Sequence, residues 1–186
     1  MFSILNKLAL AGFLAVLQFI ILIPGFAVSA FADGGSHPKG ISTDGSLGQK
    51  MNLSRPNYEI KAELGKQVEA NLFHSFQQFN IHSNESATFS GPDSAQNIIS
   101  RVTGGNASWI DGKIGSTILN ADFYFLNPAG VMFGPNVSLD LGGSFHVSTA
   151  DYLRMGENDR FYSTPHANDV KDSYLKEANF SSMIYG

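Results

Sequence analysis

The chain has 186 residues and a formal net charge of −4, and it contains 19 glycines and 15 phenylalanines but no cysteine. The lack of cysteine excludes disulfides, cysteine nucleophiles and cysteine-ligated metal sites. A weakly acidic chain without a cluster of lysines and arginines is not expected to bind nucleic acid, because such binding needs concentrated positive charge.

Residues 1–32 have the composition of an export signal. One positive charge at Lys7 precedes an apolar run, and the helix-breaking pair Pro24-Gly25 follows it. Ala30-Phe31-Ala32 fits the small-x-small site of signal peptidase, so we predict a signal peptide cleaved after Ala32. A transmembrane anchor is the alternative, since about 20 apolar residues can span a bilayer. The Pro-Gly break and the cleavage site favour removal.

The exported part keeps every basic residue except Lys7 and all 16 acidic residues, so its formal net charge is −5. About 150 residues suffice for one domain with a sizeable core. Residues 33–40 contain Gly, Ser, His and Pro and are predicted to form a flexible leader. Between residues 41 and 64, turn signals recur too closely for helices, which predicts short strands or capping loops.

The stretch 68–81 is more apolar and its periodicity is ambiguous. Phe73, Phe76 and Phe79 recur every three residues, which suits a helix, whereas the aromatic content suits a strand. We favour extended structure with a corner near residues 74–75. These phenylalanines and Asn80 are candidates for core packing or for an exposed partner-binding strip, and each buried ring would contribute about 2 kcal/mol.

Short aromatic or β-branched segments follow, separated mostly by glycine, asparagine and proline. The predicted strands are residues 86–89, 97–102, 109–114, 117–119, 122–126, 131–133, 137–141 and 144–148. Short strands with brief corners favour a coil of strands over a sandwich. We therefore predict an all-β fold, a single-stranded right-handed parallel β-helix with coils of about 20 to 25 residues. Val137, Leu139 and Leu141 are expected to point inward.

The clearest corner reads Asn-Pro-Ala-Gly-Val-Met-Phe-Gly over residues 127–134. Asparagine can accept hydrogen bonds from the amides that follow it, proline fixes φ for a turn, and glycine can adopt a positive φ. The residues assigned to this structural turn, or to recognition by a partner, are Asn127, Pro128, Gly130, Val131 and Gly134. Beyond residue 151 the sequence becomes polar, and we predict loops, at most a short helix over 170–179, and a polar tail over 162–186.

Five blocks of the chain, in matching order and spacing, resemble the N-terminal two-partner secretion domain of the filamentous haemagglutinin family. The blocks are residues 41–48, 65–76 with 79–81, 99–105, 125–134 and 144–151, within a domain that we place at 41–161. The corner motif of the family is usually Asn-Pro-Asn-Gly, and here Ala129 replaces the second asparagine. The family motif Asn-Pro-Asn-Leu is absent, and the block 101–105 stands in its place.

The resemblance implies a β-helix with N-terminal capping strands, exported by a Gram-negative bacterium and either secreted or held at the cell surface. It implies a partner, an outer-membrane transporter barrel with periplasmic repeat domains, and a role as secretion signal and folding nucleus of an adhesin. Adhesion to a host or cell-surface receptor would lie in a passenger region that follows in the relatives. We expect a monomer. The chain could be a fragment, a truncated product or a small secreted domain.

The main alternative is an enzyme, because parallel β-helices also include polysaccharide lyases and hydrolases. Asp111, Asp122 and Asp140 lie in or beside predicted strands and could align on successive coils. The sequence has no Gly-x-Ser-x-Gly elbow, no phosphate-binding loop and no paired histidines at metal-ligand spacing. We therefore predict no catalytic residue, no metal and no cofactor. A remnant of a longer adhesin, without function of its own, is the other alternative.

Overall fold

The computed structural model describes residues 37–156, 159–165 and 184–185. The predicted signal peptide and the predicted short helix at 170–179 lie outside these residues. In the described portion, no helix is long and apolar enough to cross a membrane. The described elements are strands and one short 3-10 helix, so the all-β class is confirmed.

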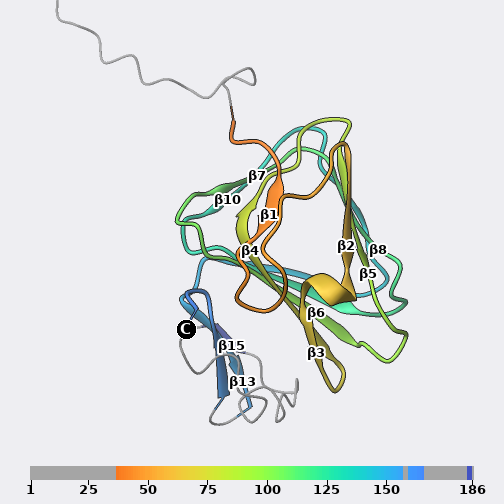
Figure 1. Cartoon of the computed structure of the whole chain (residues 1–186), viewed down its shortest axis with the longest axis vertical. Helices are drawn as coiled ribbons and strands as arrows, with labels where there is room; N and C mark the ends of the chain where they lie inside the picture. Colours follow the sequence, from red (N-terminus) through yellow and green to blue (C-terminus); the bar gives the residue numbers. More distant parts are fainter. Residues whose placement is uncertain (1–36, 157–158, 166–183, 186) are drawn as a thin grey trace, which may run out of the picture. The chain divides into compact units, whose positions relative to one another are not determined.

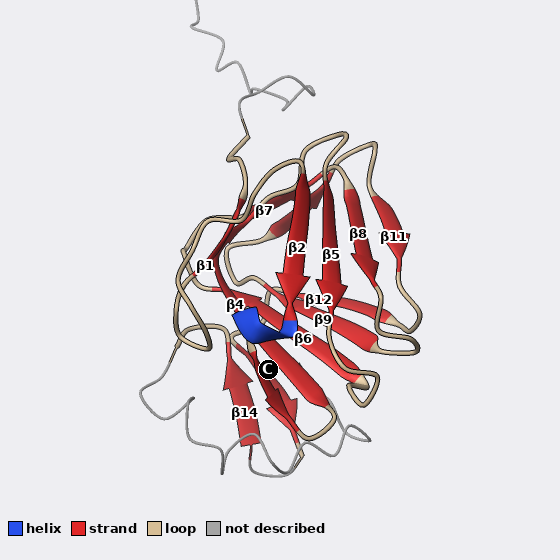
Figure 2. Cartoon of the chain, turned by 45° about the vertical axis from the view of Figure 1, so that its right-hand side comes forward, coloured by secondary structure: helices blue, strands red, loops and turns tan. Residues whose placement is uncertain are grey.

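Parallel strands stack in three faces (Figure 1). One face contains β4 (Asn71–Phe79), β6 (Asn97–Val102), β9 (Asp122–Leu126) and β12 (Phe145–Ser148). The second contains β2 (Asn57–Lys61), β5 (Ser86–Ser90), β8 (Lys113–Ser116) and β11 (Ser138–Asp140), side by side in Figure 2. The third contains β7 (Ser108–Ile110) and β10 (Val131–Phe133). The chain visits the faces in turn, which makes a parallel β-helix, as predicted, and the helix has about four coils.

Residues at equal positions on successive coils form apolar ladders inside the helix. Leu72 is in register with Ile98, Ile98 with Phe123, and Phe123 with Phe145. The rings interlock between faces, with centroids 4.8 Å apart for Phe89 and Phe123. This stacking supplies the main stabilisation of a chain without disulfides.

The N-terminal end of the helix is capped. Strands β1 (Ile41–Thr43) and β3 (Lys66–Val68) pair antiparallel with β4, and the 3-10 helix η1 (Ala62–Leu64) precedes β3. Strand β4 is continuous, so the predicted corner near residues 74–75 is wrong. Pairing with β1 and β3 on one edge and with β6 on the other holds all nine residues extended.

Two further predictions are wrong in detail. The predicted strand 109–114 is two strands, β7 and β8, separated by a corner at Gly112, where an added Cβ would collide with backbone oxygens of residues 82 and 85. The segment 117–119 is a turn, in which Ile118 is buried and Leu119 is 75% exposed. Both errors arise at corners, where apolar residues also point into the core.

The polar region after residue 151 contains strands that were not predicted. Strands β13 (Tyr152–Met155), β14 (Asp159–Tyr162) and β15 (Ile184–Tyr185) form an antiparallel sheet, and β15 lies within the predicted tail. Leu153, Met155 and Phe161 pack with Phe73 and Ile99 in a second apolar cluster. That cluster covers the outer side of the β4–β6–β9 face.

Candidate functional site

The corner between β9 and β10 is held by the buried side chain of Asn127. Its amide nitrogen donates to the carbonyl oxygen of Asn106, at 3.1 Å, and to Oγ of Ser108, at 3.0 Å. Its Oδ1 accepts from the N–H of Ala129, at 3.0 Å. Because Asn106 and Ser108 belong to the preceding coil, Asn127 ties two coils together. It is fully buried, and the residues of this corner that reach the surface are Pro128 and Ala129.

The two glycines of this segment are needed for different reasons. Gly130 has a φ of 113°, a left-handed conformation that favours glycine, and its N–H donates to the carbonyl oxygen of Asn127. At Gly134 an added Cβ would occupy the place of the Asp111 carboxylate. Val131 is half-buried against the core. Each candidate residue of this motif other than Pro128 thus has a contact or conformation that shapes the corner.

The candidate aromatic strip is buried in the folded domain. Phe76 and Phe79 lie in the interior of the helix, while Phe73 lies in the second cluster with its ring centroid 5.0 Å from that of Phe161. Asn80 is also buried, and its Oδ1 accepts from the N–H of Trp109 at 2.9 Å. A partner could reach these four residues only before the domain folds.

The three carboxylates considered for catalysis do not converge. Asp111 is buried at a corner and accepts hydrogen bonds from the N–H and the side-chain amide of Asn136. Asp122 accepts from the N–H of Ser144 at 2.7 Å, and Asp140 pairs with Lys113. Each carboxylate therefore links its own coil to the neighbouring one. Within the described residues, no group of three or more histidines and carboxylates could hold a metal ion.

A buried arginine that sequence reasoning missed joins four separate segments. Arg101 on β6 donates to Oγ of Ser75 on β4 (2.8 Å), to Oγ of Ser46 in the loop after β1 (3.1 Å) and to the carbonyl oxygen of Tyr162 on β14 (2.7 Å). Its guanidinium carbon lies 4.7 Å from the ring centroid of Phe161. The sequence feature that could have identified Arg101 is its charge, which lies among the apolar residues of the predicted strand 97–102.

Asp44 compensates the charge of Arg101 through shared hydroxyls. Its carboxylate accepts from Oγ of Ser46, Ser75 and Thr103 and from the N–H of Ser46. Burial alone would raise the pKa of Asp44, but these hydrogen bonds outweigh burial and hold it below its usual range. The cap loop, β4, β6 and the β13–β14 hairpin are thereby fastened by one polar network.

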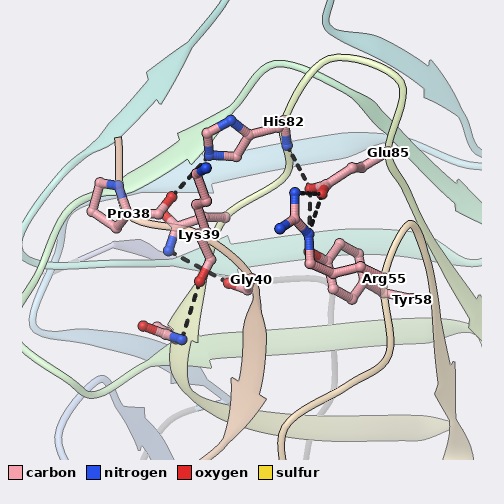
Figure 3. A network of polar contacts seen from close by, with 9 residues as sticks. Pro38, Lys39, Gly40, Arg55, Tyr58, His82 and Glu85 are labelled. Atoms are coloured by element: carbon pink, nitrogen blue, oxygen red, sulfur yellow. Dashed lines mark hydrogen bonds and ion pairs between the residues drawn. The ribbon is translucent and has the colours of Figure 1, made fainter. Parts of the chain in front are cut away.

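A second polar network surrounds Glu85 before β5 (Figure 3). The carboxylate accepts hydrogen bonds from Arg55, from the hydroxyl of Tyr58 and from the N–H of His82. Burial acts to raise the pKa of Glu85, whereas these three donors lower it below its usual range. Burial and the adjacent Glu85 charge raise the pKa of Tyr58 to about 12, so its hydroxyl remains a donor.

The first described residues lie against the same region. The carbonyl oxygen of Pro38 contacts Nε2 of His82 at 3.1 Å (Figure 3). The carbonyl oxygen of Gly40 accepts from the N–H of Asn80 at 3.0 Å. The His37 ring stacks on Trp109, with centroids 3.8 Å apart. Residues 37–40 of the predicted leader thus contact the β4–β5 corner and β7.

The two ends of the β-helix differ in exposure. At the last coil, Leu139, Phe133 and Met132 are 48%, 45% and 40% exposed. Leu139 is in register with Ile114, which is fully buried one coil earlier, so its exposure results from the lack of a described coil beyond it. This open end, defined by β10, β11 and β12, exposes both apolar side chains and strand edges.

A β-helix whose first coil is capped by antiparallel strands belongs to the class of β-solenoid domains. The particular family is shown by comparison: the model of the TPS secretion domain matches residues 39–178, and the chain belongs to this two-partner secretion family. It is also similar to the heme/hemopexin-binding protein of Haemophilus influenzae, with 26% identity over 162 residues. That match covers 84% of the chain but only 16% of the relative.

Proposed function

We propose that this domain is the secretion signal and folding nucleus of an exported, haemagglutinin-like adhesin, and that a partner transporter barrel in the outer membrane recognises it through periplasmic repeat domains. Membership of the two-partner secretion family supports export through such a partner. The role as folding nucleus is supported by a difference between the two ends of the β-helix: antiparallel strands cover the N-terminal end, whereas apolar side chains are exposed at the open end.

The open end is suited to receive another coil. A following coil would pair with β10, β11 and β12 and cover Leu139, Phe133 and Met132, each about half exposed. Burial of apolar surface contributes about 25 cal/mol per Å², and β-solenoids gain stability through contacts between neighbouring coils. Folding that starts from the capped coil can then continue in one direction, and this free energy would help to draw the chain outward.

Adhesion is proposed for the longer protein and not for this domain. The matched region covers only 16% of the relative that is named for heme and hemopexin binding, so most of that relative lies outside the part that resembles this domain. Receptor binding would therefore be carried by a passenger region joined to this domain.

The test is a secretion assay in a Gram-negative host with and without the transporter of the same organism. Residues 1–186 fused to a reporter should enter the medium only when the transporter is present. A fusion that lacks the capping segment 41–68 should remain in the periplasm. Equal release with and without the transporter would disprove the proposal.

A further inference from the structure

Residues 37–40, which precede β1, form a strap across the outside of the first two coils. Three successive carbonyl oxygens of the strap accept hydrogen bonds from alternate residues at the end of β4 and in the corner after it. The pairs are Pro38 with Nε2 of His82 (3.1 Å, Figure 3), Lys39 with the side-chain amide of Gln78 (3.3 Å) and Gly40 with the N–H of Asn80 (3.0 Å). A carbonyl oxygen can only accept, so Nε2 of His82 is the donor.

The other end of the strap lies on the second coil. The His37 ring stacks on the indole of Trp109 in β7, with centroids 3.8 Å apart and planes at 5° to each other. Ile110, the next residue of β7, packs in the core, so Trp109 points outward and is half-buried. Because residues 78–82 belong to the first coil and β7 to the second, the strap joins these two coils on their outer side.

The surface under the strap forms when the first two coils lie side by side. Oδ1 of Asn80 accepts from the N–H of Trp109 at 2.9 Å, and the N–H of Ile81 donates to the carbonyl oxygen of Trp109 at 2.8 Å. The partners of the strap in the first coil are 39 to 44 positions away in the sequence, and Trp109 is farther still. Contacts over such separations require closure of long loops, which the folded coils supply. We therefore expect the strap to close late in folding.

The strap adds surface contacts and leaves the core unchanged. Pro38 and Lys39 are exposed, and none of the four residues belongs to the two apolar clusters. The strap nevertheless leads directly into the cap, since the bond between Gly40 and Asn80 adjoins the pair of Ile41 on β1 with residue 79 on β4. Separation of β1 from β4 that begins at the start of the chain must break the strap first.

We propose that the strap is the closing element of the folding nucleus: it forms after the capped first two coils have folded, and it slows their unfolding. Contacts that are absent from the transition state slow unfolding and leave the folding rate unchanged. A nucleus that unfolds slowly persists until the following coils have stacked on the open end. This inference rests on the proposed function, because it deepens the role of the domain as a folding nucleus.

The experiment measures the folding and unfolding rates of residues 33–186 in urea by stopped-flow circular dichroism. A chain of residues 41–186, which lacks the strap, should unfold about tenfold faster. Its folding rate should stay within about twofold of that of residues 33–186, because the strap closes after the transition state.

Single substitutions test the two ends of the strap in the full-length mature chain. His37→Ala and His82→Ala should each speed unfolding about threefold. Trp109 is the only tryptophan, and a stacked imidazole quenches indole fluorescence, so His37→Ala should also raise the emission of the folded domain. The matched control is Lys39→Ala, which changes an exposed side chain of the strap and keeps the carbonyl oxygen that Gln78 contacts. Its rates and its emission should equal those of wild type.

Two results would overturn the inference. Equal unfolding rates of residues 33–186 and 41–186 would mean that the strap is a passive tail. Slower folding of the shorter chain, at an unchanged unfolding rate, would mean that the strap forms before the transition state. If circular dichroism shows that the shorter chain does not fold, the unfolding rates of His37→Ala and His82→Ala decide in the same way.

The secretion assay separates this inference from the proposed function. A reporter fusion that carries His37→Ala and His82→Ala should still need the transporter for release, but the released domain should be degraded faster by added protease than wild type. Equal resistance of the two released domains would contradict the role of the strap while the proposed function stands. Release of the wild-type fusion without the transporter would disprove the proposed function, and the unfolding rates would still decide whether the strap slows unfolding.

Discussion

His74 on β4 lies directly opposite Ser100 on β6 inside the β-helix, and the polar atoms of both side chains lack a hydrogen-bond partner among the described residues. Both residues are fully buried, beside the rings of Phe76 and Phe89. Desolvation disfavours the charged imidazole and lowers the pKa of His74 to about 3. The folded domain therefore requires a neutral histidine at this position.

This requirement predicts a loss of stability in mild acid. An unfolded histidine has a pKa near 6.5, so below that pH the unfolded chain binds a proton that the folded domain excludes. The His74 contribution is complete above about pH 6.5 and is lost progressively as the pH falls toward 3. Between pH 7 and pH 5 the free energy of unfolding should fall by about 2 kcal/mol, as measured by urea denaturation.

The variant His74→Leu should remove most of this pH dependence, because leucine fills the site without a titratable group. His146→Leu, a control on the outward side of the same face, should retain the wild-type slope. An unchanged slope in His74→Leu would show that another group titrates between the two states.

A second prediction concerns Arg101 and the β13–β14 hairpin. Arg101→Met leaves the hydroxyls of Ser46 and Ser75 and the Tyr162 carbonyl without their donor, so the free energy of unfolding should fall by about 3 kcal/mol. The hairpin should also be cleaved faster in limited proteolysis, since it is held by this arginine and by Phe161.

The matched control for this prediction is Arg160→Met. Arg160 lies over the ring of Tyr152 at the same distance, 4.7 Å, on the same hairpin, but it is exposed. Stability and proteolysis should change little in this variant. Similar effects of the two substitutions would mean that burial of Arg101 is not what fastens the hairpin.

The strands of the β-helix could be predicted because each coil repeats the same local pattern. Segments 97–102, 122–126 and 131–133 agree with β6, β9 and β10, since aromatic and β-branched residues there are bounded by glycine and asparagine. The β13–β14 hairpin could not be predicted in this way. Its two strands are short and are joined by polar residues, and their extended structure depends on packing of Leu153, Met155 and Phe161 against a face formed far earlier in the chain.

The candidate site was predictable only at its corner. Asn127 and Gly130 carry a local turn signal, so their roles in the turn follow from neighbouring residues. Three buried polar residues instead contact, or lie opposite, a residue 26 to 30 positions away in the sequence. The pairs are Glu85 with Arg55, Arg101 with Ser75, and His74 with Ser100. Such contacts depend on which residues of successive coils lie side by side. This register could not be predicted, because the sequence has no repeat of fixed period.

A third prediction tests the corner itself. Asn127→Ala removes three hydrogen bonds at a buried position and should reduce the free energy of unfolding by about 3 kcal/mol. Gly130→Ala should cost about 1 kcal/mol, because the new Cβ has space but φ stays positive. The double variant should lose transporter-dependent secretion of the reporter fusion.

Ala129→Asn is the control for this corner, since residue 129 is exposed and asparagine is the residue usual in the family. Its stability and secretion should match those of wild type. Normal secretion of a correctly folded Asn127→Ala, Gly130→Ala variant would show that export does not depend on the corner.

The last prediction compares two positions of one ladder, Ile114 on β8 and Leu139 on β11. Ile114→Ser should reduce the free energy of unfolding by about 3 to 4 kcal/mol, because the side chain is fully buried between coils. Leu139→Ser should change it by less than about 1 kcal/mol, because 48% of the residue is already exposed. Binding of a hydrophobic dye should fall in Leu139→Ser, which removes apolar surface from the open end.

In a longer chain with a further coil, Leu139→Ser should reduce the free energy of unfolding as much as Ile114→Ser does. Urea denaturation of both chain lengths measures this difference. If the cost at Leu139 is small at both lengths, the next coil does not stack on the open end.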